Sequence, residues 1–500
     1  MGRNLKVVLG TSVGVDRQGR FLVHYPSRWT STVDRNPIRF YPFELAYTST
    51  LLKARSPCNV KLIDAGARAL GLEEYADLLI AERPDVLVIE SATRCFVDDA
   101  TVAARVREAV GCHTVFVGQH ATACPDQVRE TADSLIAGEY EFTLLHLVQA
   151  LNSGRGAEGL PGVYPTPWSG QLPDVGRLPW PEDDDISRLD YAGPLPGHRY
   201  RQIQMYGSRG CPMQCNFCVA VHVYYQKPNW RGRDPDDIVA EMRYLVDRYG
   251  GRFDGVFFDE EAHFLNKGFV LDLCRKIIEG ELDFLKISAM GTYFSLDDEM
   301  LRAMRSAGYC HLKIGIETAS AEVAAAVGLG RKHDPAKLRR VLASARELGM
   351  ETYGNFQVGA LGSTFERDME TAELVRELLE SDLLCEMQVS ICTPQPGTPF
   401  YAECKKRGYL VPGDWDRYDG SLEAVVSYPH YARERVEESF RIVRDIGHHL
   451  RGLRDLRQHG LFAAGRRALE RVGLRGICEH LVAYYLNPRE RRTRLRPTNR

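Results

Sequence analysis

The sequence predicts an α/β protein in three parts: an N-terminal doubly wound, Rossmann-like domain, a partial (β/α)6 barrel of the TIM type, and a helical C-terminal region. Three observations favour this fold class. Short apolar runs typical of strands alternate with helical stretches in residues 1–151. The alternation resumes with a longer period in 199–425. Apolar residues then recur at helical spacing in 426–500, which ends in a basic tail.

The first domain contains four strand-like runs separated by predicted helices. Because these runs are apolar throughout, they indicate a parallel sheet covered by helices on both faces. In such a sheet, ligands bind beyond the carboxyl ends of the strands. Ser91, Thr93 and His120 lie there and are candidate cofactor contacts, although His120 equally fits a structural role in a loop. The expected strands are 6–10, 60–64, 85–89 and 114–118, and a helix is expected over 41–53.

Residues 152–198 differ in composition from the segments on either side. They are rich in Gly, Pro and Asp, as in the run Trp180-Pro-Glu-Asp-Asp-Asp185. Such a composition is typical of loops, because Gly and Pro interrupt regular structure. We therefore expect a linker with little regular structure.

The second domain begins at about residue 199 with a new series of βα units. Six such units in about 200 residues are typical of a TIM-type barrel that is only partly closed. In such barrels the catalytic groups collect at the carboxyl ends of the strands. The expected strands are 202–206, 255–259, 286–290, 311–317, 352–359 and 387–392, with helices over 235–249 and 268–279.

Three cysteines, Cys211, Cys215 and Cys218, directly follow the first barrel strand. Three thiolates on one short loop can bind three irons of a cubic 4Fe–4S cluster and leave the fourth iron open to a substrate or cofactor. A structural zinc site is the alternative, but it needs four protein ligands, and no second Cys-x-x-Cys occurs in the sequence. The spacing therefore favours an iron–sulfur site built for chemistry.

Composition and charge restrict the remaining possibilities. The 500 residues are 44% hydrophobic and 26% charged, and no apolar run approaches the roughly 20 residues of a membrane span. The N-terminus lacks a signal-peptide profile, and the thirteen cysteines fit a reducing compartment, so we expect a cytoplasmic protein. The last fifty residues contain 13 Arg and 4 acidic residues, a net charge of +9, which leaves −12 for the rest. An acidic body favours a neutral or cationic small molecule over nucleic acid.

The Cys-x-x-x-Cys-x-x-Cys run after the first strand of a partial barrel resembles the radical S-adenosylmethionine (SAM) superfamily. The resemblance extends from about residue 5 to 420 and is strongest to the subgroup with an N-terminal cobalamin-binding-type domain. The landmarks that carry it are Tyr41-Pro-Phe-Glu-Leu-Ala-Tyr, Gly118-Gln-His-Ala-Thr, Gly138-Glu-Tyr-Glu, Ser208-Arg-Gly-Cys, Gly315-Ile-Glu-Thr and Thr393-Pro-Gln-Pro-Gly-Thr.

The resemblance implies that SAM binds the open iron through its amino and carboxylate groups. An electron from the cluster then cleaves the sulfonium and yields methionine and a 5′-deoxyadenosyl radical, while the protein supplies position and shielding. By position in the motif, the three cysteines are the cluster ligands and Phe217 is the aromatic residue near adenine. Glu317 is the candidate for a polar contact to the ribose or methionine part of SAM, and Gln357 lies on the adenine side.

Asp259 and Glu260 occupy the region that meets the methionine amine of SAM in the family. If Glu260 and His263 face inward, either one is placed to serve as an acid or base near the substrate; the alternative is a solvated loop. We therefore treat Asp259 as a candidate cofactor contact and the other two as candidate catalytic residues.

The resemblance implies cobalamin-dependent C-methylation of a small natural product, with an electron donor such as flavodoxin or ferredoxin. The Asp-x-His-x-x-Gly signature, whose histidine ligates cobalt in many cobalamin proteins, is absent; the chain reads Leu9-Gly-Thr-Ser-Val-Gly-Val-Asp16. Cobalamin bound without a protein ligand and a domain that no longer binds cobalamin both stay open. The alternatives are a cobalamin-free diol dehydratase or deoxygenase for an aminoglycoside-type sugar, and a non-catalytic iron–sulfur redox sensor.

Overall fold

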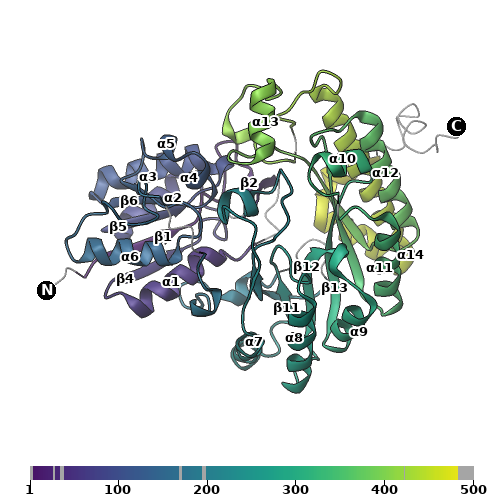
Figure 1. Cartoon of the computed structure of the whole chain (residues 1–500), viewed down its shortest axis with the longest axis horizontal. Helices are drawn as coiled ribbons and strands as arrows, with labels where there is room; N and C mark the ends of the chain where they lie inside the picture. Colours follow the sequence, from purple (N-terminus) through teal and green to yellow (C-terminus); the bar gives the residue numbers. More distant parts are fainter. Residues whose placement is uncertain are drawn as a thin grey trace.

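The computed structural model describes residues 4–25, 29–33, 39–167, 172–193, 199–330, 332–421 and 423–481. Figure 1 shows two α/β bodies side by side, the N-terminal domain in purple and blue and the barrel in teal and green. The helix α13 (Pro399–Arg407) lies over the junction between them. The predicted fold class is confirmed.

The N-terminal domain is a five-stranded parallel sheet in the order β4-β1-β5-β6-β7. Alternate residues of β1 point to opposite faces: Val7 and Leu9 pack toward α1 and α6, and Val8 packs toward α2 and α3. The sheet is therefore covered on both faces. Its strands are β1 (Lys6–Gly10), β4 (Asn59–Ile63), β5 (Val86–Glu90), β6 (His113–Val117) and the short β7 (Ser134–Leu135), which the sequence reading missed. Its helices are α1 (Phe43–Arg55), α2 (Leu72–Glu82), α3 (Phe96–Val110), α4 (Gln119–Ala123), α5 (Pro125–Val128) and α6 (Glu141–Asn152).

A β-hairpin that the sequence reading also missed joins the two domains. Its strands are β2 (Phe21–Tyr25) and β3 (Trp29–Val33), which pair antiparallel. The Tyr25 hydroxyl donates a hydrogen bond to the Asp259 carbonyl oxygen in the barrel at 3.1 Å. The Thr32 hydroxyl donates to the carboxylate of Asp419, which lies beside β15 at the opposite edge of the barrel sheet. The hairpin therefore contacts the barrel at two separate places.

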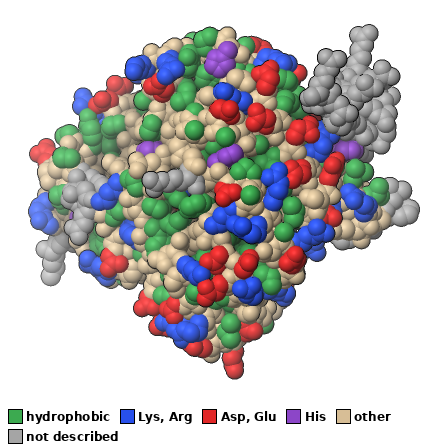
Figure 2. Space-filling model, turned by 45° about the vertical axis from the view of Figure 1, so that its right-hand side comes forward, with side chains coloured by type: hydrophobic (Ala, Val, Ile, Leu, Met, Phe, Trp, Pro, Cys, Tyr) green, Lys and Arg blue, Asp and Glu red, His purple; other side chains and the backbone are tan. Residues whose placement is uncertain are grey.

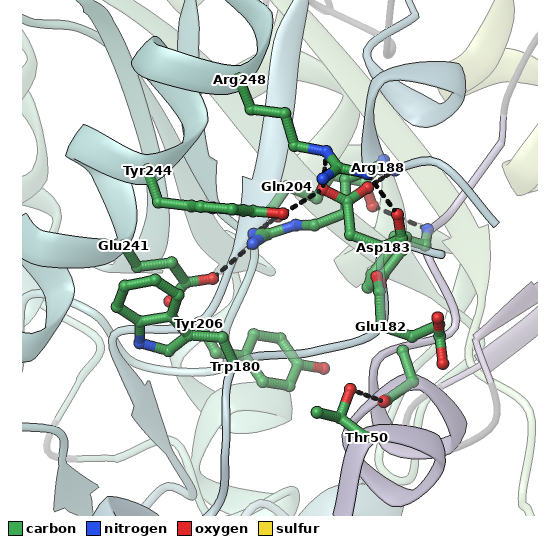
Figure 3. A network of polar contacts seen from close by, with 12 residues as sticks. Thr50, Trp180, Glu182, Asp183, Arg188, Gln204, Tyr206, Glu241, Tyr244 and Arg248 are labelled. Atoms are coloured by element: carbon green, nitrogen blue, oxygen red, sulfur yellow. Dashed lines mark hydrogen bonds and ion pairs between the residues drawn. The ribbon is translucent and has the colours of Figure 1, made fainter. Parts of the chain in front are cut away.

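The predicted linker is a packed strap. Its described residues form two short 3₁₀ turns, Val175–Arg177 and Arg188–Tyr191. Arg188 and Glu241 of α7 form an ion pair at 2.6 Å, and both side chains are 1% exposed (Figure 3). On the other side, Glu182 accepts a hydrogen bond from Lys53 of α1 at 2.6 Å. The strap therefore ties the N-terminal domain to the outer face of the barrel.

The barrel contains the six predicted parallel strands in the order β15-β14-β13-β12-β11-β8. The outer strands β8 and β15 are not hydrogen-bonded to each other, so the barrel is open. Its strands are β8 (Gln202–Met205), β11 (Gly255–Phe258), β12 (Lys286–Thr292), β13 (Tyr309–Glu317), β14 (Glu351–Val358) and β15 (Glu386–Ile391).

The helices around the barrel begin where the sequence supplies capping residues. The side chains of Asp234, Asn266, Asp297, Asp334 and Thr364 each accept a backbone N–H bond in the first turn of the following helix. One apolar core lies between these helices and the sheet. The helices are α7 (Pro235–Tyr249), α8 (Lys267–Glu279), α9 (Asp298–Ser306), α10 (Ala321–Ala326), α11 (Pro335–Glu347) and α12 (Phe365–Glu380).

The C-terminal region is helical, as predicted. The helix α14 (Arg433–Leu481) packs on α12 and β15. The Arg-rich tail lies in 482–500, outside the described residues. Within the described chain, no helix is long and apolar enough to cross a membrane. On the face drawn in colour in Figure 2, acidic and basic side chains are interspersed.

Candidate active site at the cysteine loop

The three cysteines lie on one loop beyond the carboxyl end of β8. The loop runs from the short strand β9 (Ser208–Arg209) to a π-helical turn at Ala220–Tyr224. Asn216 docks it on the segment after α10: its backbone N–H donates to the Val327 carbonyl at 3.0 Å and its side chain donates to the Ala326 carbonyl at 3.2 Å. The Asn216 carbonyl in turn accepts from Phe400 of α13 at 3.1 Å. Tertiary contacts thus fix the loop.

The donor set of this loop fits an iron–sulfur cluster. Burial raises the pKa of the Cys211, Cys215 and Cys218 thiols, to about 12 for Cys218. The Lys332 ammonium, 3.5 Å from the Cys215 sulfur, opposes this rise at Cys211 and Cys215. Among the described residues no three His, Cys, Asp or Glu side chains surround a single metal ion. A cubic cluster differs, because each thiolate binds a different iron.

Two consecutive carboxylates hold the backbone that leads into the loop. Glu260 accepts hydrogen bonds from the Gly207 N–H and from the Ser208 hydroxyl, the latter at 2.8 Å. Glu261 accepts from the Gly210 N–H at 3.2 Å. Gly210 has φ +92°, and a Cβ there would lie 2.8 Å from the Asn229 carbonyl oxygen, so only glycine fits.

An open pocket of about 560 Å³ lies beside Cys211. This figure includes space that is open to solvent at the mouth of the pocket. The polar lining combines both signs of charge, with Glu261 and Glu317 opposite Lys332. The lining residues are Cys211, Glu261, Ala262, Leu265, Gly291, Thr292, Tyr293, Gly315, Ile316, Glu317, Leu329, Lys332 and His333.

Glu317 ends β13 in an unusual backbone conformation. Its φ is +70°, and the pairing of β13 with β14 shifts between Gly315 and Glu317. A non-glycine residue with positive φ is strained, and such strain concentrates at functional sites. Gln357 of β14 donates to the Glu317 carboxylate at 2.7 Å. Burial raises the pKa of Glu317 to about 7, although Lys332 and Gln357 act in the opposite direction. The two residues that the sequence predicted as SAM contacts are thus bonded to each other, and Glu317 lines the pocket.

The other residues predicted in the barrel do not line this pocket. Phe217 is half-buried and packs against the barrel core. The Asp259 side chain is 3% exposed. Glu260 and His263 are fully buried: His263 Nδ1 lies 2.7 Å from Glu260 and Nε2 lies 2.8 Å from the Tyr309 hydroxyl. The alternative of a solvated loop is therefore wrong for these two residues.

The predicted contacts on the N-terminal sheet are buried and bonded to protein groups. Ser91 donates to Asp99 at 2.7 Å, and burial raises the pKa of Asp99 to about 7. His120 stacks on Phe96, with ring centres 4.2 Å apart. Its two ring nitrogens lie 3.3 Å from the Thr93 hydroxyl and 3.2 Å from Gln127 Oε1. Burial lowers the pKa of His120 to about 4, so the ring is neutral.

The sequence reading missed Lys332. It lies 117 residues after Cys215 in the chain and reaches that thiol only through the fold of the loop after α10. A single lysine beside a histidine has no distinguishing pattern in the sequence. The arrangement as a whole combines three thiols on one loop, an ammonium group beside one of them, and a carboxyl–amide pair whose carboxyl lines the pocket next to Cys211.

Comparison with known proteins agrees with this geometry. A profile of the radical SAM superfamily matches residues 205–375. An uncharacterised methyltransferase of Pyrococcus horikoshii is 27% identical over 415 residues, which cover 80% of this chain and 86% of the relative.

Two solved structures share the fold. TsrM from Kitasatospora setae is a radical SAM methyltransferase solved with cobalamin and a 4Fe–4S cluster; the TM-score is 0.62 at 17% identity, over 81% of this chain and 75% of TsrM. TsrM was also solved with tryptophan as substrate. OxsB, a cobalamin-dependent SAM radical enzyme, gives a TM-score of 0.69 at 13% identity, over 98% of this chain and 74% of OxsB. Residues 205–375 of this chain therefore match the radical SAM superfamily, and the chain shares the two-domain fold of these two solved structures.

Proposed function

We propose that this protein is a radical SAM methyltransferase that methylates a carbon of a small natural product and uses cobalamin. The observation that carries the proposal is the set of three thiols beside a pocket that also holds Glu317 and Lys332. When bound, the cluster and SAM supply the electron and the 5′-deoxyadenosyl radical that removes hydrogen, and cobalamin supplies the methyl carrier.

The chain's own residues bind and orient the reactants. Cys211, Cys215 and Cys218 hold the irons as thiolates. Lys332, 3.5 Å from the Cys215 sulfur, balances part of the negative charge of those thiolates. Glu317, held by Gln357 at 2.7 Å, offers a carboxylate to the amine or the ribose hydroxyls of SAM.

Four further residues act around this centre. Phe217 would contact the adenine, an assignment that rests on its place in the sequence motif. Glu260 and His263 act through position, because their bonds hold the backbone before the cysteine loop. Asp259, buried at the end of β11, is assigned to the methionine end of SAM on its place in the sequence motif.

For cobalamin, the residues at the carboxyl edge of the N-terminal sheet fit a cofactor that the protein binds without a side-chain ligand to cobalt. His120 is fully buried and both of its ring nitrogens have protein partners, so it supplies no cobalt ligand. The half-buried side chains near the edge of the N-terminal sheet are small, as at Thr122, Ala123 and Ala137. Ser91 and Thr93 follow the carboxyl end of β5 and are fully buried. We therefore place cobalamin at this edge with cobalt unligated by protein.

Methylation is favoured over dehydration and over a non-catalytic sensor. The P. horikoshii relative and TsrM both carry the name of methyltransferases. We also propose a small-molecule substrate, as tryptophan is for TsrM. We further propose a flavodoxin or ferredoxin as electron donor and a cytoplasmic location, which suits the oxygen-sensitive cluster.

The test is anaerobic reconstitution with iron and sulfide, followed by reduction in the presence of SAM that carries a deuterated methyl group. Candidate natural-product intermediates are supplied with and without cobalamin, and products are read by mass spectrometry. A deuteromethylated product together with 5′-deoxyadenosine, made only with cobalamin, is the expected result. A dehydrated, unlabelled product would overturn methylation, and a fully loaded cluster that yields no 5′-deoxyadenosine would overturn the enzyme assignment.

A further inference from the structure

Arg209 stands two residues before Cys211 and is almost completely buried at the boundary between the two domains. Its side chain is 3% exposed. One guanidinium nitrogen lies 2.6 Å from the Glu141 carboxylate and 3.1 Å from that of Glu139. Both glutamates belong to the N-terminal domain, and their side chains are 0% exposed. A cluster-loop residue is therefore bonded directly to the other domain.

A second arginine strengthens this contact. Strand β10 (Arg231–Gly232) pairs antiparallel with β9, and Arg231 stands opposite Arg209 in the register. Arg231 pairs with Glu139 at 2.9 Å and donates to the Pro173 carbonyl of the strap at 2.7 Å. Rings of Tyr47 and Tyr225 lie against the two guanidinium groups, at 5.0 Å from Arg209 and 5.4 Å from Arg231. Two arginines on one ribbon thus pair with the same carboxylate, that of Glu139.

The residues around Arg209 are held from the opposite side. Glu260 holds Gly207 and Ser208, and Glu261 holds Gly210. These carboxylates belong to the barrel. The entry to the cysteine loop is therefore clamped between carboxylates of the barrel and carboxylates of the N-terminal domain, and Arg209 makes the contact to the latter.

The glutamates that Arg209 contacts follow the carboxyl end of β7. The Gly138 N–H, immediately before Glu139, donates to the Thr122 hydroxyl at 2.8 Å, and Thr122 is one of the small residues at the edge to which we assign cobalamin. A continuous series of contacts therefore runs from this edge through Gly138 and Glu139 to Arg209.

We propose that Arg209 is a positioning residue through which the N-terminal domain sets the conformation of the cysteine loop. Charged hydrogen bonds in a buried site are directional and strong, so the guanidinium holds the loop at a fixed distance from Glu139 and Glu141. This inference rests on the proposed role of Cys211, Cys215 and Cys218 as cluster ligands. It adds a link between the two domains that the cluster assignment alone does not require.

The first test uses hydrogen–deuterium exchange in the full-length, metal-free protein. R209Q, which removes the charge, should accelerate exchange in the peptide covering 207–219 by about tenfold or more. E139Q/E141Q should give the same acceleration, and the combined variant should add little to either. The matched control is R94Q, which breaks an equally buried ion pair, Arg94–Asp16, within the N-terminal domain. It should accelerate exchange around Asp16 and leave 207–219 unchanged.

The second test uses the reconstituted proteins. R209Q should keep the iron content of the unaltered chain but show a changed electron paramagnetic resonance spectrum after reduction, and form 5′-deoxyadenosine about tenfold more slowly. R209K, which keeps the charge, should recover part of both effects. Unchanged exchange, spectrum and rate in R209Q would overturn the inference, as would equal effects of R94Q on the loop. If the unaltered chain binds no cluster, it is the proposed function that fails.

Discussion

Replacement of Glu317 by glutamine should stabilise the metal-free protein at neutral pH while it weakens SAM binding. The carboxyl lies at the end of β13 with φ +70°, and burial raises its pKa from the usual 4.5 to about 7. The folded protein therefore keeps a proton that the unfolded chain has lost, and its free energy of unfolding falls as pH rises through this interval. Relative to a carboxyl that stays protonated, the raised pKa lowers the free energy of unfolding by about 1 kcal/mol at pH 5 and by about 3 kcal/mol at pH 8.

Glutamine retains an oxygen that accepts the bond from Gln357 but has no charge to bury. E317Q should therefore have a higher free energy of unfolding than the unaltered chain, and this gain should be about 2 kcal/mol larger at pH 8 than at pH 5. The measurement is urea unfolding of the metal-free proteins. The same variant should bind SAM about tenfold more weakly or worse after reconstitution, because it loses a charged hydrogen-bond acceptor. The control is E322Q, whose carboxyl is exposed on α10 and should show no such gain with pH. Equal stability differences at both pH values, or unchanged SAM binding, would refute the reasoning.

Three further predictions follow from the other parts of the structure. C215A should lose the cluster, read from iron content and the visible spectrum, because two thiols remain for the three irons that need protein ligands; retained turnover contradicts it. R188M should lower the free energy of unfolding by about 1–3 kcal/mol, since Glu241 and the Gln204 carbonyl lose a buried hydrogen-bond donor while Glu241 keeps its pair with Arg233; an unchanged free energy of unfolding speaks against the strap as a tie between domains. H120Q should leave the visible spectrum of bound cobalamin unchanged, because His120 is held by Thr93 and Gln127 and not available to cobalt; a shift of that spectrum would assign His120 to the metal.

Local patterns in the sequence were sufficient for the architecture. The six barrel strands and four of the five strands in the N-terminal sheet are apolar runs bounded by helices, and the structure has each close to the predicted position. The loop of Cys211, Cys215 and Cys218 was identified from spacing alone. Both features depend on residues close together in the chain.

Features that depend on long-range contacts were not accessible in this way. The strap was read as a linker because Gly, Pro and Asp suggest a loop, whereas Arg188 and Glu182 are buried by partners on α7 and α1. Glu260 and His263 are buried because His263 hydrogen-bonds to the Tyr309 hydroxyl, which lies 46 residues later in the chain. Lys332 likewise becomes a site residue only because its loop folds back on Cys215.

The most direct test of the central claim is the formation of 5′-deoxyadenosine from SAM by the anaerobically reconstituted, reduced protein. Iron and sulfide content establish that the cluster is loaded, and C215A serves as the control. We predict that 5′-deoxyadenosine forms with the unaltered chain and is absent with C215A. A loaded, reduced protein that binds SAM but releases no 5′-deoxyadenosine would contradict the assignment of this site to radical chemistry.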